Sequence, residues 1–212
     1  MIHRRMGLAA AAAVVAMVAG CSSGSGKDSG AAISVSPTAA GTYKGQSFPT
    51  PRPRPAFTLT DTTGKSYNFG AQTTGHPTLV YFGYTHCPDI CPTTMATFGV
   101  ALSQVSAKLR KDTRVVFVTT DPKRDTPAVI ARWLGHFDAD LPVKFVGLTG
   151  SQKQVDAAQQ LAGVPLATDH GQQHSAEVLL YGADNLDHVF YTTGASPSDI
   201  SHDLPLVGAE KE

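Results

Sequence analysis

Two cysteines, Cys87 and Cys91, stand four positions apart, and each is followed by a proline. Residues four apart on a helical turn lie about 5–6 Å apart at Cβ, so their sulfurs could bind one metal ion or close a disulfide. The alternatives are a purely structural disulfide, or two core cysteines that happen to be neighbours. A loop that follows a strand is a common place for functional residues, which favours a chemical site.

The residues on either side of the cysteines predict a strand and a helix. Residues 78–84 form a short β-branched and aromatic run, which is typical of a strand buried on both faces. From Thr93 onward the apolar residues follow a helical period, and this helix is expected to end near Arg110. Its apolar face comprises Met95, Phe98, Leu102, Val105 and Leu109.

The prolines place the cysteines at or just before the start of this helix. Pro88 and Pro92 lack an amide hydrogen, and the first turn of a helix tolerates that loss. Unpaired amides and the helix dipole at this position favour thiolates and lower the thiol pKa. The pair Cys87 and Cys91 is therefore expected to be reactive.

Two thiolates alone satisfy few metals well, so a further ligand is expected. His174 lies in the loop before an apolar run over 178–181. Ligands in open α/β sheets gather beyond the carboxyl ends of the parallel strands. If the 178–181 strand runs antiparallel beside the 78–84 strand, His174 lies beside the cysteines. His170 is its rival, and His86 is expected to point away from Cys87. The remaining histidines show no sequence signal of a partner ligand and are expected to be surface or loop residues: His76, His136, His188 and His202.

The order of the elements predicts an α/β domain. Residues 115–120 form a second buried strand, parallel to the first and joined to it by a right-handed crossover. Residues 56–61 and 66–69 predict an N-terminal hairpin, and residues 178–181 and 189–192 a C-terminal one. We expect three layers around a central mixed sheet.

Two helices in the second half of the chain have defined ends. A helix over 151–162 is expected to bury Val155, Ala158 and Leu161 and to be closed by Gly163. A final short helix begins at Ser196-Pro197 and is expected to stop at Pro205.

The chain has 212 residues, 42% of them hydrophobic, with 17 basic and 17 acidic residues. This balance gives no electrostatic footprint for nucleic acid, so no nucleic-acid partner is expected. Residues 48–208 are enough for one domain with a large core, followed by a tail over 209–212.

The first residues resemble a secretory leader. Residues 1–20 carry two arginines and then an apolar stretch over 8–18, which is too short to span a bilayer. The sequence Val-Ala-Gly-Cys that ends at Cys21 resembles the lipobox of bacterial lipoproteins, in which the leader is cut before a diacylated cysteine. The alternative is an ordinary leader cut nearby. If Cys21 is diacylated, residues 21–47 would be a lipidated, flexible tether on the outer face of the cytoplasmic membrane.

Three motifs resemble the SCO/SenC family, over roughly residues 48–204. They are Tyr-Thr-His-Cys-Pro-Asp-Ile-Cys-Pro at 84–92, Asp-Pro-Lys-Arg-Asp-Thr-Pro at 121–127, and His-Ser-Ala at 174–176. Members are membrane-tethered, thioredoxin-like proteins involved in assembling the copper centre of cytochrome c oxidase. The resemblance implies that Cys87, Cys91 and His174 bind copper. The C-terminal end is short for the family.

Ligand chemistry agrees with copper. Soft thiolates suit Cu(I), and an added imidazole also accommodates Cu(II), whereas zinc would be expected to recruit a fourth protein ligand. Asp121 and Asp125 are expected just outside the ligands: an aspartate beside a helix cap usually orders its own loop, and direct contact with the metal is the less favoured alternative. Asp89, between the cysteines, could modulate the site through its charge.

Two functions remain open. The first is a metallochaperone that takes copper from an unidentified donor and delivers it to the dinuclear CuA site of cytochrome c oxidase subunit II. The second is a thiol–disulfide oxidoreductase that uses Cys87 and Cys91 on the cysteines of the same target. General thioredoxin-like oxidoreductases have two residues between their cysteines and a proline before the facing strand, but this chain has three residues and no such proline. A peroxidase would need a lone reactive cysteine beside an arginine, which no residue nearby clearly supplies.

Overall fold

The computed structural model describes residues 42–208. The predicted leader, Cys21, most of the predicted tether and the tail over 209–212 lie outside the described residues. Within residues 42–208, no helix has both the length and the apolar character needed to cross a membrane.

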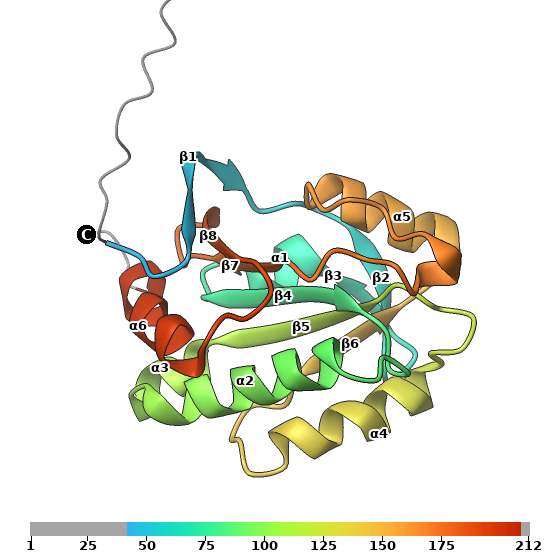
Figure 1. The fold of residues 1–212 in the computed structure, drawn as a ribbon, viewed down its shortest axis with the longest axis horizontal. Helices are drawn as coiled ribbons and strands as arrows, with labels where there is room; N and C mark the ends of the chain where they lie inside the picture. The colour runs from blue at the N-terminus through green and yellow to red at the C-terminus, as the bar shows by residue number, and fades with distance from the viewer. Residues whose placement is uncertain (1–41, 209–212) are drawn as a thin grey trace, which may run out of the picture. The chain divides into compact units, whose positions relative to one another are not determined.

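Within the described residues, eight strands form one mixed sheet in the order β1-β8-β7-β4-β5-β6-β2-β3 (Figure 1). The strands are β1 (Gln46–Pro53), β2 (Thr58–Asp61), β3 (Ser66–Asn68), β4 (Thr78–Gly83), β5 (Arg114–Thr119), β6 (Val146–Thr149), β7 (Val178–Tyr181) and β8 (Leu186–Tyr191). Strands β4, β5 and β6 run parallel, and the other pairs are antiparallel. The predicted mixed sheet is therefore confirmed.

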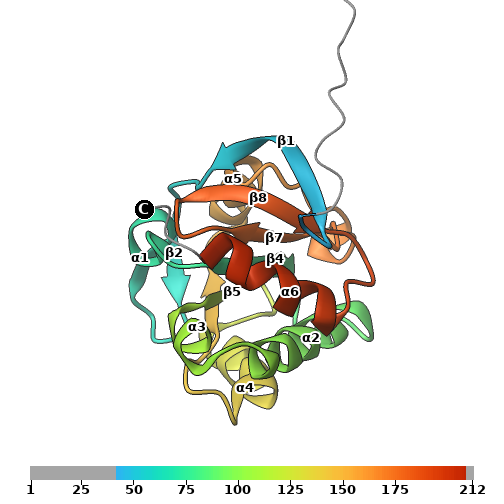
Figure 2. The same cartoon turned by 90° about the vertical axis from the view of Figure 1, so that its left-hand side faces the viewer.

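Helices cover both faces of this sheet. They are α1 (Phe69–Thr73), α2 (Ile90–Gln104), α3 (Ala107–Asp112), α4 (Pro127–Asp138), α5 (Gln152–Leu161), the 3₁₀ turn η1 (Asp169–Gly171) and α6 (Pro197–Gly208). Figure 2 shows α2 and α4 on one side of the sheet and α5 on the other. The three predicted layers are thus present.

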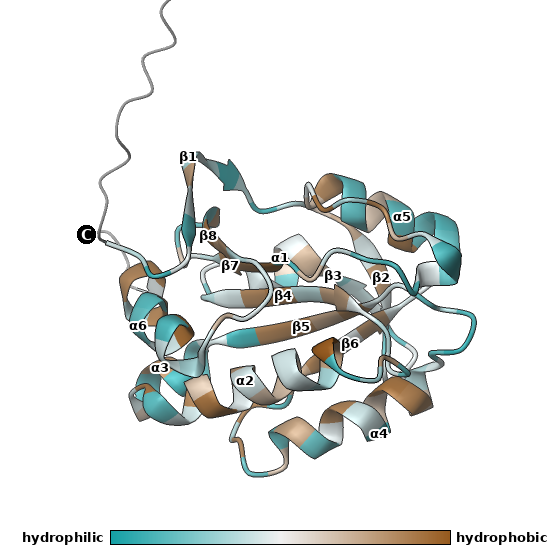
Figure 3. Ribbon diagram, in the orientation of Figure 1, coloured by the Kyte–Doolittle hydropathy of each residue, from teal (hydrophilic) through white to brown (hydrophobic). Residues whose placement is uncertain are grey.

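Side-chain alternation along the strands produces two cores, one on each face. Tyr81 of β4 points into the core shared with α2, α4 and α6, whereas its neighbour Phe82 points into the core shared with α1 and α5. Every residue of β4 is buried, as expected for a strand covered on both faces. Figure 3 shows the apolar residues concentrated on central strands such as β5 and β7, with hydrophilic residues on the outer surface of α5.

Both predicted hairpins are present, but only one lies at an edge of the sheet. Strands β2 and β3 form the N-terminal hairpin at one edge. The C-terminal hairpin of β7 and β8 is covered by β1, which pairs antiparallel with β8 and forms the other edge. Strand β1 carries Pro49, Pro51 and Pro53, and an edge strand tolerates prolines because its outward amides need no partner.

The domain includes the last residues of the predicted tether. Strand β1 begins at Gln46, and the backbone N–H groups of Lys44 and Gly45 donate to the buried carboxylate of Asp203 at 2.8–3.0 Å. Tyr43 packs against the core on the α2 face. The boundary predicted at residue 47 was therefore too late, because the partners that hold these residues are more than 100 positions away.

The long helix predicted to end near Arg110 is two helices. Helix α2 ends at Gln104, and Ser106 starts α3 by accepting a hydrogen bond from the N–H of Leu109. The Arg110 side chain donates to the free carbonyl groups of Leu102, Ser103 and Val105 at the end of α2. These bonds stabilise the break.

Two further expectations were wrong. Helix α6 continues through Pro205, because Leu204 and Val207 on either side of it are buried. Leu161 is 57% exposed, since the buried face of α5 is centred on Val155, Ala158 and Gln159 and leaves it to one side.

Candidate metal centre

The two cysteines lie where β4 leads into α2. Cys87 is in the loop after β4, and Cys91 is the second residue of α2. Pro92 falls in the first turn of the helix, as expected, whereas Pro88 lies just before it. Both thiols are free and buried, and Cys91 is completely inaccessible to solvent.

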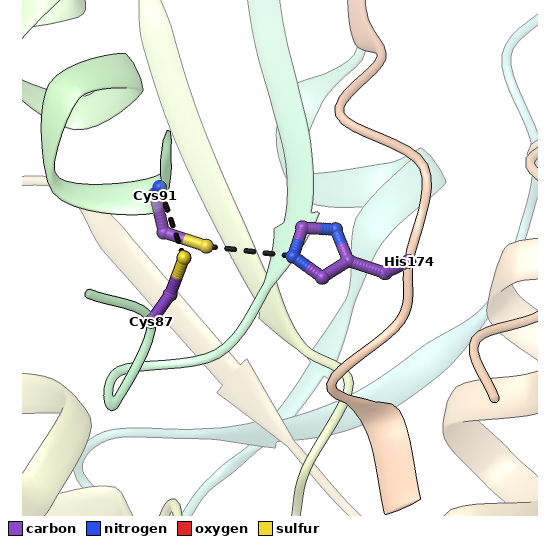
Figure 4. A group of neighbouring side chains, drawn as sticks. All are labelled: Cys87, Cys91 and His174. Carbon is purple, nitrogen blue, oxygen red and sulfur yellow. Dashed lines mark hydrogen bonds between the residues drawn. The ribbon is translucent and has the colours of Figure 1, made fainter. Parts of the chain in front are cut away.

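His174 reaches this pair from the opposite side of the site. Strand β7 pairs antiparallel with β4, with Val178 opposite Tyr81, so the loop before β7 lies beside the loop after β4. The Nε2 atom of His174 is 3.5 Å from the Sγ atom of Cys91 (Figure 4). One ligand atom from each of Cys87, Cys91 and His174 lies within 4.8 Å of the other two. The three predicted residues thus form a possible metal site.

The ring of His174 is held in the orientation that a ligand requires. Its Nδ1–H donates to the backbone carbonyl of Ser175 at 2.8 Å, which leaves the Nε2 lone pair directed toward the sulfurs. The rings of Tyr81 and Tyr84 pack edge-on against the imidazole, at centroid distances of 5.9 and 5.6 Å. Burial lowers the pKa of His174, which favours the neutral form that binds metal.

The two thiols differ in acidity. Burial acts to raise the pKa of Cys87, but backbone N–H groups of Asp89, Cys91 and Ile90 bond its sulfur and bring the pKa below its ordinary value. The N–H of Cys91 is 3.4 Å from that sulfur. The prediction of an acidic thiol is thus confirmed for Cys87.

Burial raises the pKa of Cys91 to about 12, although the Tyr81 hydroxyl donates to its sulfur at 3.5 Å. The prediction of an acidic thiol was therefore wrong for Cys91, because the cost of burying a charge exceeds the effect of the helix N-terminus. In the absence of metal, the arrangement pairs an acidic Cys87 with a protonated Cys91.

The donor set fits a soft metal ion with three ligands. Among the described residues, no other cysteine, histidine or acidic side chain joins these three as a fourth possible ligand. Two sulfurs and one imidazole nitrogen suit copper better than a structural zinc ion, which takes four protein ligands. Because the thiols of the pair are free, they can become thiolate ligands by releasing their protons to solvent.

Asp125 is next to the thiol loop but does not belong to the group of possible ligands. Its buried carboxylate accepts hydrogen bonds from the N–H of Thr85 at 2.9 Å and from the hydroxyl of Thr85 at 2.5 Å. A third bond comes from the hydroxyl of Thr119 at 2.6 Å. Asp125 thus connects the end of β5 to Thr85, two positions before Cys87. This agrees with the sequence-based expectation that this aspartate orders a loop.

The other two aspartates also lie outside the group. Asp121 is buried and forms a salt bridge with Arg124, whose guanidinium carbon lies 5.9 Å from the ring centre of Tyr84. Because Tyr84 packs on His174, Asp121 supports one wall of the site indirectly. Asp89 is exposed and makes no side-chain bond to the helix that it precedes.

The other histidines are separate from the site. His86 turns toward Asp125, with its Nδ1 atom 3.4 Å from the carboxylate, as expected from its predicted orientation. His170 lies in η1 and does not join the group. Three others pair with aspartates away from the cysteines: His76 with Asp112, His188 with Asp184 and His202 with Asp203.

The sequence reasoning missed two tyrosines that contact the possible ligands. Tyr81 donates to the Cys91 sulfur, and both Tyr81 and Tyr84 touch the His174 ring. The available signal was strand alternation: Tyr81 is two positions before the end of β4, on the face that α2 covers.

Comparison with known proteins gives the family. The family model described as SCO1/SenC matches residues 46–206. A SCO2-like protein of Rickettsia felis is 35% identical over 136 residues, which cover 64% of this chain and 60% of the relative. The protein SenC of Rhodobacter capsulatus is 39% identical over 102 residues, covering 48% of this chain and 43% of SenC. The matches thus span about two-fifths to three-fifths of the length of these relatives.

Solved structures show the same fold. ScoI of Bradyrhizobium japonicum with copper bound has 30% identity and a TM-score of 0.61, covering 72% of this chain and 98% of ScoI. BsSco is described as a member of the Sco family of cytochrome c oxidase assembly proteins with a disulfide switch. It has 25% identity and a TM-score of 0.58, and the match covers 76% of this chain and 96% of BsSco. The predicted thioredoxin-like fold is confirmed. The chain belongs to the SCO1/SenC family.

Proposed function

We propose that this protein is a copper metallochaperone for cytochrome c oxidase, which delivers copper to the dinuclear CuA site of subunit II. The observation that carries the proposal is the convergence of Cys87, Cys91 and His174 within 4.8 Å. Family membership supports it, since the similar ScoI of Bradyrhizobium japonicum holds copper. The copper ion is cargo, and a three-ligand site leaves room for a target ligand to approach.

The three ligands would contribute unequally to binding of the two copper oxidation states. Thiolates of Cys87 and Cys91 hold Cu(I), which prefers soft ligands. The Nε2 atom of His174 adds the harder donor that Cu(II) requires. Because the imidazole is already neutral and oriented by Ser175, it binds without losing a proton.

We also propose that the protein acts on the outer face of the cytoplasmic membrane, anchored through lipidated Cys21. The support is the Val-Ala-Gly-Cys sequence after an apolar leader. Two acyl chains suffice for stable membrane attachment. Replacement of Cys21 by serine should release the protein from washed membranes, and retention of that variant in the membrane fraction would contradict this placement.

A second function is favoured by the unequal thiols. An acidic, less buried Cys87 beside a buried, protonated Cys91 is an arrangement suited to thiol–disulfide exchange. The Cys87 thiolate would attack a target disulfide, releasing one target thiolate and forming a mixed disulfide. Cys91 would then lose its proton and attack the Cys87 sulfur. The products are a Cys87–Cys91 disulfide and a fully reduced target.

A transfer experiment separates the two functions. The full chain carrying Cys21→Ser has Cys87 and Cys91 as its only thiols, because the sequence contains three cysteines. This protein is reduced, loaded with Cu(I) and mixed with the reduced, copper-free soluble domain of subunit II, after which copper is measured in each separated protein. We expect copper to move to the target from the parent protein and no stable loading of the Cys91→Ser variant.

The same chain without copper is mixed with target whose cysteines are oxidised. Reduction of the target disulfide, combined with failure to transfer copper to the reduced target, would establish the oxidoreductase instead. In cells, Cys87→Ser or Cys91→Ser should abolish oxidase assembly. Rescue by added copper favours delivery, whereas rescue by an external reductant favours thiol exchange.

A further inference from the structure

The segment that carries His174 is fixed at its C-terminal side by the central sheet. Strand β7 starts at Val178, which is paired with Tyr81 of β4. Between Val178 and His174 the chain has no regular structure, and the N–H of Glu177 bonds the hydroxyl of Ser175. The position of the imidazole therefore also depends on how the N-terminal side of this segment is held.

A compact turn over residues 168–173 forms that N-terminal side. Thr168 and Gln173 pair as an isolated bridge, with their N–H and carbonyl groups bonded at 2.8 and 3.1 Å. The N–H of Gly171 also donates to the carbonyl of Thr168, at 3.0 Å. Gln173 immediately precedes His174, so any displacement of this turn moves the imidazole.

The turn is attached to the sheet through one buried hydroxyl. Thr120, directly after β5, donates from its Oγ1 atom to the carbonyl of Gly171 at 2.7 Å. The N–H of Thr120 donates to the carbonyl of Gly83, at the end of β4, at 2.7 Å. Thr120 therefore connects the strand that leads to the cysteines with the turn that leads to the histidine. Its side chain is completely buried, so water cannot replace the bond.

Close backbone contact at the same point requires glycine. A Cβ atom on Gly171 would lie 2.0 Å from the carbonyl oxygen of Thr120 and 3.0 Å from the N–H nitrogen of Asp121. Gly171 also has a φ of 89°, which L side chains rarely adopt. Any side chain at position 171 must push the turn away from the end of β5.

The backbone of the turn is itself strained. Asp169 and His170 have φ values of 49° and 53°, so three successive residues are left-handed. Such a run costs free energy for residues other than glycine, and it persists only where surrounding contacts hold it. The bond from Thr120 is therefore one of the contacts on which this conformation depends.

We propose that Thr120 and Gly171 are positioning residues that set the place of His174 relative to the two thiols. Neither residue belongs to the possible metal ligands, and both act through the 168–173 turn. The inference deepens the proposed copper function and, for its metal readout, rests on it. Adjacent Thr119 serves the thiol side in the same way, through Asp125, so the end of β5 holds both halves of the site.

The test uses the full chain carrying Cys21→Ser as the parent and four further variants of it. Thr120→Val removes the hydroxyl while keeping the shape, and Thr120→Ser keeps the hydroxyl. Gly171→Ala introduces the clash with β5. Its matched control is Gly64→Ala, because Gly64 has a comparable φ of 81° but no atom within 4 Å of the added Cβ.

Affinities for Cu(II) and Cu(I) are measured separately by competition titration. We expect Thr120→Val and Gly171→Ala to weaken Cu(II) binding by about 10–100-fold, the loss typical of a residue that orients a metal ligand. Cu(I) binding should change far less, since the thiols carry it. Thr120→Ser and Gly64→Ala should bind both ions as the parent does.

A metal-free readout keeps the proposal testable if copper binding itself fails. Nuclear Overhauser contacts between the His174 and Tyr84 rings report the imidazole position directly. Their loss in Thr120→Val and return in Thr120→Ser would support the proposal whether or not the parent binds copper. Retention of these contacts in Thr120→Val would overturn it. So would an equal loss of Cu(I) and Cu(II) affinity, which indicates general damage to the fold.

Discussion

The role of Asp125 gives the sharpest prediction about what holds the thiol loop. Asp125→Asn keeps one acceptor oxygen and replaces the other by a donating amide. The carboxylate accepts three bonds, two from Thr85 and one from Thr119, so the variant loses one or two of them. A hydrogen bond to a charged group contributes about 1.5–3 kcal/mol, and we therefore expect a destabilisation of about 2–4 kcal/mol.

Thermal unfolding of the metal-free protein measures this loss. For a domain of this size, 1 kcal/mol shifts Tm by roughly 2–4 °C, so Asp125→Asn should lower Tm by about 5–15 °C. Asp89→Asn is the matched control, because Asp89 is exposed and makes no cap bond, and its Tm should stay within about 2 °C of the parent.

The copper spectrum then separates the two possible roles of Asp125. Because its carboxylate serves Thr85 and Thr119 rather than the metal, the electron paramagnetic resonance spectrum of the Cu(II)-loaded variant should match that of the parent. An unchanged Tm together with an altered Cu(II) spectrum would refute the loop-ordering role and establish a metal contact.

Three further predictions concern single side chains. Iodoacetamide at pH 7 should modify Cys87 well before Cys91, because the pKa of Cys87 is lowered whereas burial raises that of Cys91 to about 12. Mass spectrometry measures the order of labelling, and earlier labelling of Cys91 would contradict this prediction. His174→Ala should weaken Cu(II) binding more than Cu(I) binding in competition titrations, and equal retention of both ions would remove His174 from the site. Burial raises the pKa of Asp187 to about 7 despite its bond to Arg52. The folded state therefore binds more protons than the unfolded state, and the free energy of unfolding should fall as pH rises from about 4 to 7. Urea unfolding should show a flatter pH dependence in Asp187→Asn, and an unchanged slope would contradict that assignment.

The sequence signals around the two cysteines are local. The strand, loop and helix around Cys87 and Cys91 follow from a change of period within about 20 residues. The place of His174 needed more: the assumption that β7 runs antiparallel to β4, which the register of Val178 opposite Tyr81 confirms, and the family resemblance, which favoured His174 over His170.

The features that the sequence did not predict depend on distant partners. Residues just before β1 belong to the domain because of Asp203, and α6 passes through Pro205 because residues on both sides of the proline are buried. The pKa of Cys91 rises because of burial, which the helix-terminus argument did not include. Local propensity cannot reveal any of these three effects.

X-ray absorption at the copper edge tests the central claim most directly. The full chain carrying Cys21→Ser is reduced and loaded with one equivalent of Cu(I). We predict two sulfur neighbours and one histidine nitrogen around each copper, with the nitrogen lost and both sulfurs kept in His174→Ala. Persistence of the histidine signal in that variant, or more than two sulfur neighbours per copper in the parent, would contradict a site formed by Cys87, Cys91 and His174 of a single chain.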